Sequence, residues 1–251
     1  MKLITFMLGL VIGSFLNLCI HRIPLGISVI TPPSHCPKCN YRLGVVDLVP
    51  VISFLLLRGK CRRCSAKISV RYPLVELCCG AAFLGFFLYF GLSLEYAAAL
   101  VLFSGLLVSS LIDIEHRIIP NGVNLAMAVP AVPLLLLQSA ELLLMGLFGA
   151  LVGGGLLLLA AVLSKGGMGG GDIKLAAVLG LYLGWPHILL VLFGACLMCS
   201  TVGITLVLLK KKTLKDILPF GPYLSIAALT VLLWGDEIVS WYVSTLLKGG
   251  I

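Results

Sequence analysis

The sequence predicts an all-α polytopic membrane protein with about eight transmembrane helices and a small cytoplasmic zinc-ribbon-like subdomain. Of the 251 residues, 60% are hydrophobic and only 11% are charged, whereas soluble domains carry about 25% charged residues. Apolar runs long enough to cross a hydrocarbon core recur from end to end of the chain. The one sizeable polar segment, residues 21–72, contains two Cys-x2-Cys pairs. Together these observations exclude a soluble protein.

The apolar runs define eight expected spans, because roughly 18 apolar residues in a helix cross a ~30 Å hydrocarbon core. They cover residues 3–20, 73–91, 96–113, 121–138, 142–163, 173–186, 188–209 and 219–235. The sixth span is short for a complete crossing. We expect the first span to be a retained helix, since no small-x-small cleavage site follows it. The tail 236–251 is expected to extend along the interface through Trp241 and Tyr242.

The distribution of charge predicts the orientation of these spans. The net charge is +8, and 16 of the 18 Lys and Arg residues fall in four segments on one side of the expected topology. These segments are 21–72, 114–120, 164–174 and 210–218. Cytoplasmic loops carry the excess of Lys and Arg, so both termini are expected to face outward. The positive charge therefore reflects topology and attraction to anionic headgroups, and we expect a lipid bilayer, not nucleic acid, as the partner.

The two cysteine pairs, "CPKC" at 36–39 and "CRRC" at 61–64, predict a zinc site. Each pair sits on a tight knuckle, and two pairs at this spacing bring four thiolates into a tetrahedron. A segment of about fifty residues needs such a cross-link, because it is too short to bury a large hydrophobic core. Disulfides are the weaker interpretation in the reducing cytoplasm. The expected ligands are Cys36, Cys39, Cys61 and Cys64, and four sulfur ligands leave no open position for catalysis.

Two further features concern the packing of the chain. The apolar stretch "LVPVISFLLLRG" at 48–59 fits either an interfacial hairpin or the core of the zinc subdomain. Small residues in the fifth span, among them Gly146, Gly149 and the glycines at 153–155, are expected to let helices approach closely. We therefore expect two regions, 1–72 with the first helix and the zinc subdomain, and 73–251 with the remaining helices.

Carboxylates at the expected cytoplasmic boundary are candidates for a functional site, because ionisable groups at membrane depth are costly. They are Glu76, Asp113 and Asp172. Asp172 follows a glycine-rich loop, "KGGMGGGDIK", and can also be explained as a helix cap. That explanation does not extend to Asp113, which ends a span, where the helix dipole disfavours an anion.

Two aspartates at adjacent helix ends suggest hydrolysis. When two such groups share a site, one is protonated while the other is ionised. The ionised group can take a proton from water, while the protonated group polarises a peptide carbonyl. Glycines before Asp172 would let an extended substrate lie close to the backbone.

At these residues the sequence resembles the prepilin peptidases, or type IV leader peptidases, an aspartic membrane protease family with a GxGD motif. The match includes Gly169–Asp172 followed by Ile173 and Lys174, and Asp113 in "DIEHRIIPN". It extends over essentially the whole chain through "GSFLNLCIHRIP" at 13–24, both cysteine pairs and "RYPLVE" at 71–76. The resemblance implies that Asp113 and Asp172 are the catalytic pair, with Gly169, Gly171 and Lys174 supporting the catalytic loop and the four cysteines binding zinc.

The resemblance also implies the substrates and a second activity. Such enzymes remove the basic leader of type IV prepilins or pseudopilins after a glycine, at the cytoplasmic face of the bacterial inner membrane. They then methylate the new N-terminus with S-adenosylmethionine, an activity that would belong to residues 1–72, while residues 73–251 would form the peptidase domain. Asn17 and Glu76 are candidates for holding the amine or the methyl donor. An interhelical hydrogen bond for Asn17 and a pairing of Glu76 with Arg71 are equally compatible with the sequence.

Two other classes of function fit parts of the pattern. Boundary carboxylates and broken helices also mark transporters, but here the charges lie at one face and not at mid-membrane. The bundle could also act as a membrane anchor that displays a zinc adaptor.

Overall fold

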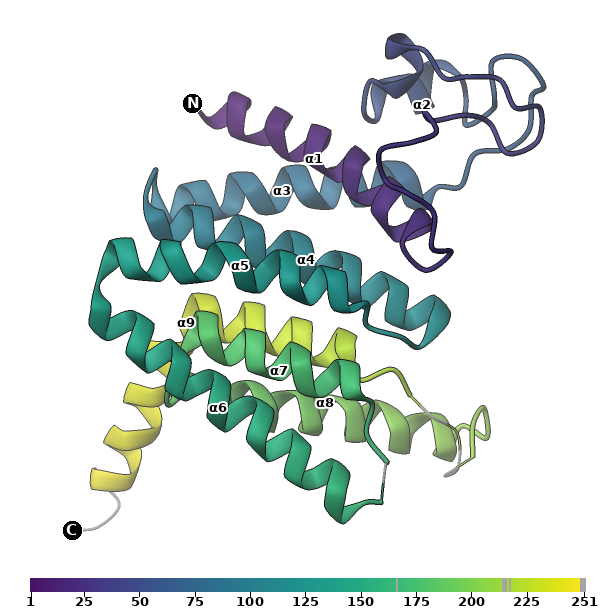
Figure 1. Ribbon diagram of the computed structural model, residues 1–251. Coiled ribbons are helices and arrows are strands. Elements are labelled where there is room, and N and C mark those ends of the chain that lie inside the picture. Colours follow the sequence, from purple (N-terminus) through teal and green to yellow (C-terminus); the bar gives the residue numbers. More distant parts are fainter. Residues whose placement is uncertain (166, 214–215, 217, 249–251) are drawn as a thin grey trace. The chain divides into compact units, whose positions relative to one another are not determined.

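The computed structural model describes residues 1–165, 167–213, 216 and 218–248, with side chains up to residue 245 (Figure 1). In these residues the chain is helical and has no strand, which confirms the all-α class. The elements in chain order are α1 (Lys2–Arg22), η1 (Val45–Leu48), α2 (Ile52–Leu56), α3 (Arg71–Phe90), α4 (Leu94–His116), α5 (Asn121–Gln138), α6 (Ala140–Leu163), α7 (Gly170–Leu183), α8 (His187–Leu208) and α9 (Gly221–Lys248).

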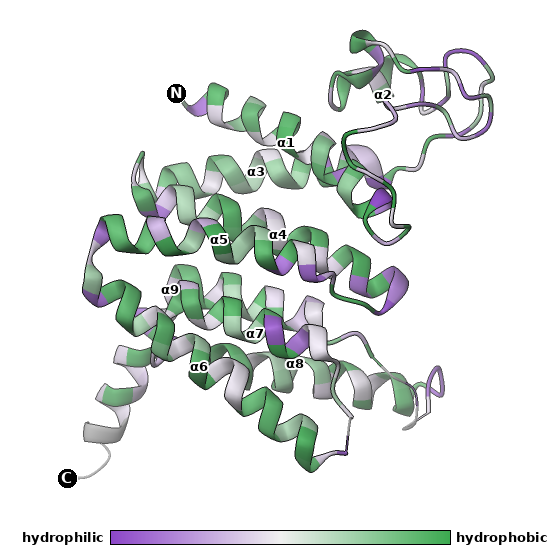
Figure 2. Ribbon diagram, in the orientation of Figure 1, coloured by the Kyte–Doolittle hydropathy of each residue, from purple (hydrophilic) through white to green (hydrophobic). Residues whose placement is uncertain are grey.

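Each of the eight predicted spans coincides with one long helix of the described chain. Seven of these helices are long and apolar enough to cross a membrane. The exception is α7, whose 14 residues correspond to the short sixth span. Figure 2 shows that hydrophobic residues dominate the helices, while hydrophilic residues concentrate in the loops and at helix ends. Helix α9 continues beyond the predicted end at residue 235, and its backbone leaves helical geometry at Trp234, one residue before that point.

The chain divides into two compact units, Met1–Leu100 and Val101–Ile251. In the first unit, α1 packs along α3, as the adjacent ribbons in Figure 1 show. Glycines permit this approach: a Cβ at Gly13 would lie 2.8 Å from the Cα of Glu76, and a Cβ at Gly9 would lie 2.6 Å from the carbonyl oxygen of Cys79. Close backbone contact through small residues is the usual means of helix association in membranes. The functional division at residue 72 remains a prediction.

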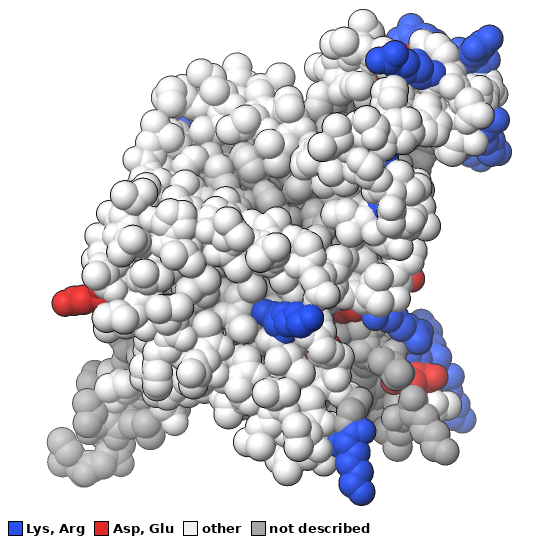
Figure 3. Space-filling view, viewed as in Figure 1, with Lys and Arg blue, Asp and Glu red and all other residues white. Residues whose placement is uncertain are grey.

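The polar segment between α1 and α3 is mostly irregular, and Lys and Arg side chains gather over it (Figure 3). Its apolar stretch does not form a buried core, since none of the residues of α2 is buried. Ile52 is 50% exposed and Leu55 is 67% exposed. The alternative in which 48–59 forms a buried core of the zinc subdomain is therefore wrong, because the residues of α2 are not buried.

In the second unit, α6 and α7 pack closely through small residues, as predicted for the glycines of the fifth span. Gly149 of α6 and Gly180 of α7 face each other so closely that a Cβ on either would overlap the other's backbone. Ala176 and Ile188 likewise occupy the space that a Cβ at Gly153 would need. A Cβ at Gly155, in contrast, would meet nothing within 4 Å. This contact fixes α7, and with it Asp172, against a rigid neighbour. Helix α5 packs on the same helix α7.

Candidate active site and metal centre

Asp113 lies in the last turn of α4 and is only 6% exposed. Its carboxylate is bound by the backbone at the start of α9: the N–H of Gly221 donates to Oδ2 at 3.0 Å. Gly221 has no room for a side chain, because a Cβ there would lie 2.9 Å from the same oxygen. Since free N–H groups at a helix start attract anions, α9 compensates for the unfavourable position of Asp113 at the end of α4.

Asp172 lies in the first turn of α7, where Gly169 occupies the N-cap position. Its Oδ1 atom is buried and has no hydrogen-bond partner in the described part of the chain. The Gly169 N–H approaches the carboxylate, as a capping interaction would require. Asp172 also experiences the charge of Asp113. Helix capping therefore explains the contact of one carboxylate oxygen. The buried Oδ1 has no such contact and can bind a substrate or water.

Ile119, in the turn between α4 and α5, connects the two aspartates. A Cβ at Gly171, the residue before Asp172, would lie 2.9 Å from the Cβ of Ile119. A Cβ at Gly221, the donor to Asp113, would lie 3.2 Å from the Cδ1 of Ile119. The Ile119 side chain thus contacts both α7, next to Asp172, and the start of α9, which binds Asp113. Glycine at 171 is required by this close approach.

Lys174 binds the segment that follows Asp113. Its Nζ donates to the Oδ1 of Asn121, the first residue of α5, at 2.8 Å. This bond joins α7 to α5 one half-turn beyond Asp172. The sequence reasoning singled out Lys174 but did not identify Asn121, Ile119 or Gly221. The "FGP" before α9 predicts a helix start, but nothing in its spacing indicates that the helix contacts Asp113.

The four cysteines of the polar segment form one cluster, with all four Sγ atoms within 4.8 Å of one another. Cys36 and Cys64 are separated by 3.8 Å, and Cys39 and Cys61 by 4.0 Å. Zinc–sulfur bonds of 2.3 Å in a tetrahedron require sulfur–sulfur distances of about 3.8 Å. The predicted residues therefore fit a metal ion that binds four thiolates. The backbone N–H groups of Cys39 and Lys38 lower the pKa of the Cys36 thiol to about 6, which favours the thiolate that metals bind.

The metal cluster is built from two equivalent knuckles. In the first, the N–H of Cys36 donates to Tyr41 and its carbonyl accepts from Asn40; in the second, Cys61 bonds in the same way to Ala66 and Ser65. Asn40 and Ser65 both adopt left-handed backbone angles, with φ of 54° and 55°. The two halves are joined by a bond from Arg62 Nε to Asp47 Oδ1 at 2.7 Å. This hydrogen bond lowers the pKa of the Asp47 carboxyl group.

Asn17 and Glu76 both lie in the first unit and both are buried. The Nδ2 of Asn17 in α1 donates to the carbonyl of Tyr72 in α3 at 2.9 Å, while its Oδ1 has no partner among the described residues. The Oε2 of Glu76 accepts a 2.7 Å hydrogen bond from the backbone N–H of Val51. These contacts attach the polar segment and α1 to α3, and they leave one buried oxygen, the Oδ1 of Asn17, available to a ligand.

Comparison with known proteins gives two family matches and a series of relatives. Residues 7–90 match the bacterial peptidase A24 N-terminal domain, and residues 100–204 match the type IV leader peptidase family. A prepilin leader peptidase/N-methyltransferase of Stutzerimonas stutzeri is 36% identical, over 96% of this chain and 93% of its own length. Proteins of the same name from Bacillus subtilis and Pseudomonas aeruginosa are 36% and 35% identical, each over 96% of this chain and over 97% and 92% of their own lengths. No solved structure matches the chain.

Proposed function

Since the chain belongs to the type IV leader peptidase family, we propose that it cleaves the basic leader of type IV prepilins or pseudopilins after a glycine, as an aspartic endopeptidase. The family match confirms the peptidase class that the sequence analysis predicted. The observation that carries the proposed mechanism is the convergence of Asp113 and Asp172 around Ile119, with one buried aspartate oxygen left unpaired. A transporter or a zinc adaptor would not need this pair.

The two aspartates divide the chemistry between them. One carboxyl group of the pair is ionised and acts as the general base that removes a proton from the attacking water. The other carries a proton and donates it to the scissile carbonyl. For these roles Asp172 offers an unpaired Oδ1, while Asp113 is held through Oδ2 by the Gly221 N–H. The tetrahedral intermediate then collapses as the leaving amine takes a proton from the pair. Mutual repulsion of the two carboxylates keeps one of them protonated at the start of the cycle.

The site is proposed to face the cytoplasm at the boundary of the bacterial inner membrane. The excess of Lys and Arg in residues 21–72 and in the loops beside Asp113 and Asp172 supports this orientation. A substrate with a hydrophobic helix can diffuse laterally in the bilayer and present its leader junction at this depth. The leader is basic, and the carboxylates of the site provide a local negative charge for it.

We further propose that the chain methylates the new N-terminal residue with S-adenosylmethionine, as the names of its relatives indicate for them. When bound, this donor would supply the methyl group to the free amine. Residues 1–72 are assigned to this activity and residues 73–251 to the peptidase. The unpaired Oδ1 of Asn17 is the group best placed to accept a hydrogen bond from the amine or the donor, while Glu76 holds the polar segment through Val51.

Cys36, Cys39, Cys61 and Cys64 are proposed to hold a structural Zn²⁺. Four thiolates fill the coordination sphere of zinc, so the ion would fix the two knuckles together without taking part in hydrolysis. The fold of this segment would otherwise depend on few buried apolar contacts.

Purified protein incubated with a prepilin in detergent tests the peptidase. Asp113→Asn and Asp172→Asn should each reduce the cleavage rate at least ~100-fold, because general acid–base catalysis contributes about 10²–10⁴. Circular dichroism and thermal unfolding establish that both variants fold. Normal cleavage by either variant would refute the aspartate mechanism. Glu115→Gln serves as the matched control, since Glu115 lies two residues from Asp113 on the same helix and is exposed.

A further inference from the structure

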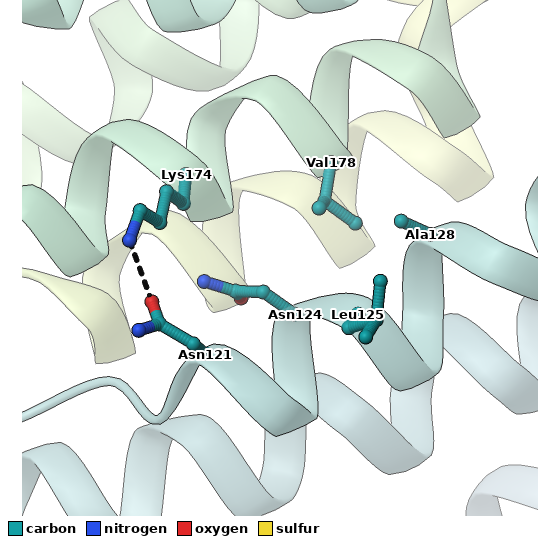
Figure 4. Close-up of a pocket in the computed structure, with 6 residues that line it drawn as sticks. All are labelled: Asn121, Asn124, Leu125, Ala128, Lys174 and Val178. Atoms are coloured by element: carbon teal, nitrogen blue, oxygen red, sulfur yellow. Dashed lines mark hydrogen bonds between the residues drawn. The ribbon is translucent and has the colours of Figure 1, made fainter.

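An open pocket lies between α5 and α7 in the second unit (Figure 4). Its volume is about 320 Å³. Its accessible surface is almost entirely apolar, although the lining residues include two amides and an ammonium group. The lining residues are Asn121, Asn124, Leu125, Ala128, Lys174 and Val178. The pocket is distinct from the two carboxyl groups, neither of which lines it.

Asn124 is the unusual residue of this pocket. It is only 5% exposed, and both its Nδ2 and its Oδ1 are buried without a hydrogen-bond partner in the described chain. Figure 4 shows its amide extending from α5 into the space between the two helices. Burying a donor and an acceptor without partners destabilises the fold. A residue that carries this penalty at the wall of an open pocket is suited to bind a ligand there.

The other two polar side chains of the pocket, Lys174 and Asn121, are hydrogen-bonded to each other. Lys174 donates to Asn121 at 2.8 Å, so this pair holds the two helices at a fixed separation. The amide of Asn124 therefore lies in a preorganised pocket, with its own hydrogen-bonding capacity free. Preorganisation reduces the free-energy cost of binding a ligand.

The donor and the acceptor of one amide together select the class of ligand. A side-chain amide presents an N–H and a C=O side by side. In an extended polypeptide the N–H and the C=O of one residue point to the same side and can pair with both groups of the amide. A phosphate or carboxylate oxygen would satisfy the Nδ2 and leave the Oδ1 unpaired. The geometry therefore favours a polypeptide backbone over a lipid headgroup.

The position of the pocket relates it to the aspartates. Lys174 follows Asp172 by two residues, which is about 3 Å along the axis of α7 and about 200° around it, so the two side chains leave the helix on different faces. On the other wall, Asn121 begins α5 only eight residues after Asp113. The pocket and the carboxyl groups therefore lie at the same end of α7, and a peptide held in the pocket would have to pass around the start of this helix to reach the carboxyl groups.

We propose that the α5–α7 pocket is a substrate-binding subsite in which the Asn124 amide pairs with the backbone N–H and C=O of one substrate residue outside the scissile bond. The inference rests on the proposed peptidase function. The apolar wall formed by Leu125, Ala128 and Val178 receives the adjoining apolar side chain of the same substrate. Asn124 is thus a positioning residue that aligns the substrate with the aspartates.

The first test replaces Asn124 by leucine, whose side chain has the same number and branching of heavy atoms but no hydrogen-bonding group. Asn124→Leu should lower kcat/KM for a prepilin at least about tenfold, while its melting temperature stays the same or rises because two unpaired polar atoms are removed. Gln138→Leu on the same helix is the matched control, because the Gln138 amide already donates to the Leu134 carbonyl. It should keep the wild-type kcat/KM. An unchanged kcat/KM in Asn124→Leu would overturn the proposal and would indicate a pocket filled by water or lipid.

The second test uses synthetic substrates in which single backbone N–H groups near the cleavage site are replaced by ester oxygens. One ester position should lower kcat/KM with the wild-type enzyme but cause little further loss with Asn124→Leu, since the two changes remove the same hydrogen bond. Additive losses at every position would contradict the pairing.

A binding measurement separates this inference from the peptidase proposal. A fluorescent prepilin is titrated onto Asp172→Asn protein with and without Asn124→Leu, so that no cleavage is needed. Weaker binding by at least about tenfold in the double variant supports the subsite, even if the wild-type protein fails to cleave and the peptidase proposal is wrong. Equal binding overturns the subsite whatever the outcome of the cleavage assay.

Discussion

The metal centre and the aspartate pair are built in opposite ways. All four cysteines come from one segment of 29 residues, and two repeated knuckles place them by local backbone hydrogen bonds. The two aspartates come from helices α4 and α7, and they depend on Gly221 of α9 and on Ile119 between α4 and α5. The first site is therefore a property of local sequence, whereas the second is a property of the packed bundle.

This difference predicts that the two sites fail separately. A change that destroys the metal centre should alter the polar segment and leave the aspartates in place, because the knuckles lie in the first unit and the aspartates in the second. A change in helix packing should act in the opposite way. The predictions below test this separation, beginning with the largest expected effect.

Loss of the metal should unfold the polar segment without ending peptide hydrolysis. Cys36→Ser combined with Cys61→Ser should abolish zinc binding, since structural zinc contributes about 10–16 kcal/mol in small zinc domains at neutral pH. Metal analysis and protease sensitivity of residues 21–72 measure this effect, and prepilin cleavage should stay within about threefold of wild type. Cys196→Ser with Cys199→Ser is the matched control, because this second Cys-x2-Cys lies on helix α8 and should leave the metal content unchanged. Equal loss of metal and cleavage would mean that the two sites are coupled.

A side chain at position 171 should disturb the aspartate pair and spare the metal. In Gly171→Ala the new Cβ would press on Ile119, and such overpacking costs about 1–3 kcal/mol. We expect a lower melting temperature and at least about tenfold slower cleavage at unchanged zinc content. Gly170→Ala is the matched control, because a Cβ at Gly170 meets nothing within 4 Å. A similar effect of both variants would indicate that loop flexibility, and not the contact with Ile119, matters.

The same contrast explains how much could be predicted from the sequence. The eight spans followed from apolar length, and the cluster of four cysteines followed from spacing, because both signals are local. Lys174 and the glycines at 169 and 171 were found through their neighbourhood to Asp172 and their resemblance to a known motif. The sequence did not reveal Gly221, Asn121 or Asn124, because their importance arises from contacts between helices that no spacing encodes.

The apolar stretch 48–59 shows the converse limit. Its composition allowed a buried core, yet Ile52 and Leu55 are exposed, and the repeated backbone hydrogen bonds of this segment lie in the cysteine knuckles. Hydrophobic composition predicts burial poorly in a segment of this size, because too few residues are available to cover it.

A smaller effect is expected from the link between α7, which carries Asp172, and α5. Lys174→Met removes the 2.8 Å bond to Asn121 but retains the aliphatic stem of the side chain. A hydrogen bond to a charged group contributes about 1.5–3 kcal/mol when buried and less at an exposed site such as this one. Cleavage should slow about two- to tenfold, mainly through a higher KM, while the zinc content is unchanged. Lys174→Arg, which can still donate to Asn121, should recover most of the loss, and failure of this rescue would argue against the hydrogen bond as the cause.

The smallest effect should come from the ion pair that joins the two knuckles. Asp47→Asn removes the charge that accepts from Arg62 Nε. The Asp47 side chain is only 5% exposed, but solvent screens the pair through Arg62, whose side chain is 50% exposed, so we expect a small contribution. Zinc affinity measured by competition with a chelator should fall at most about fivefold. Because the hydrogen bond lowers the pKa of Asp47, its contribution is complete at neutral pH and is lost only as the pH falls through that lowered pKa. The difference between Asp47→Asn and wild type should thus be the same at pH 8 and pH 6 and should shrink in ~1 M salt. A difference that persists in high salt would show that the metal centre depends on the shape of the Asp47 side chain and not on its charge.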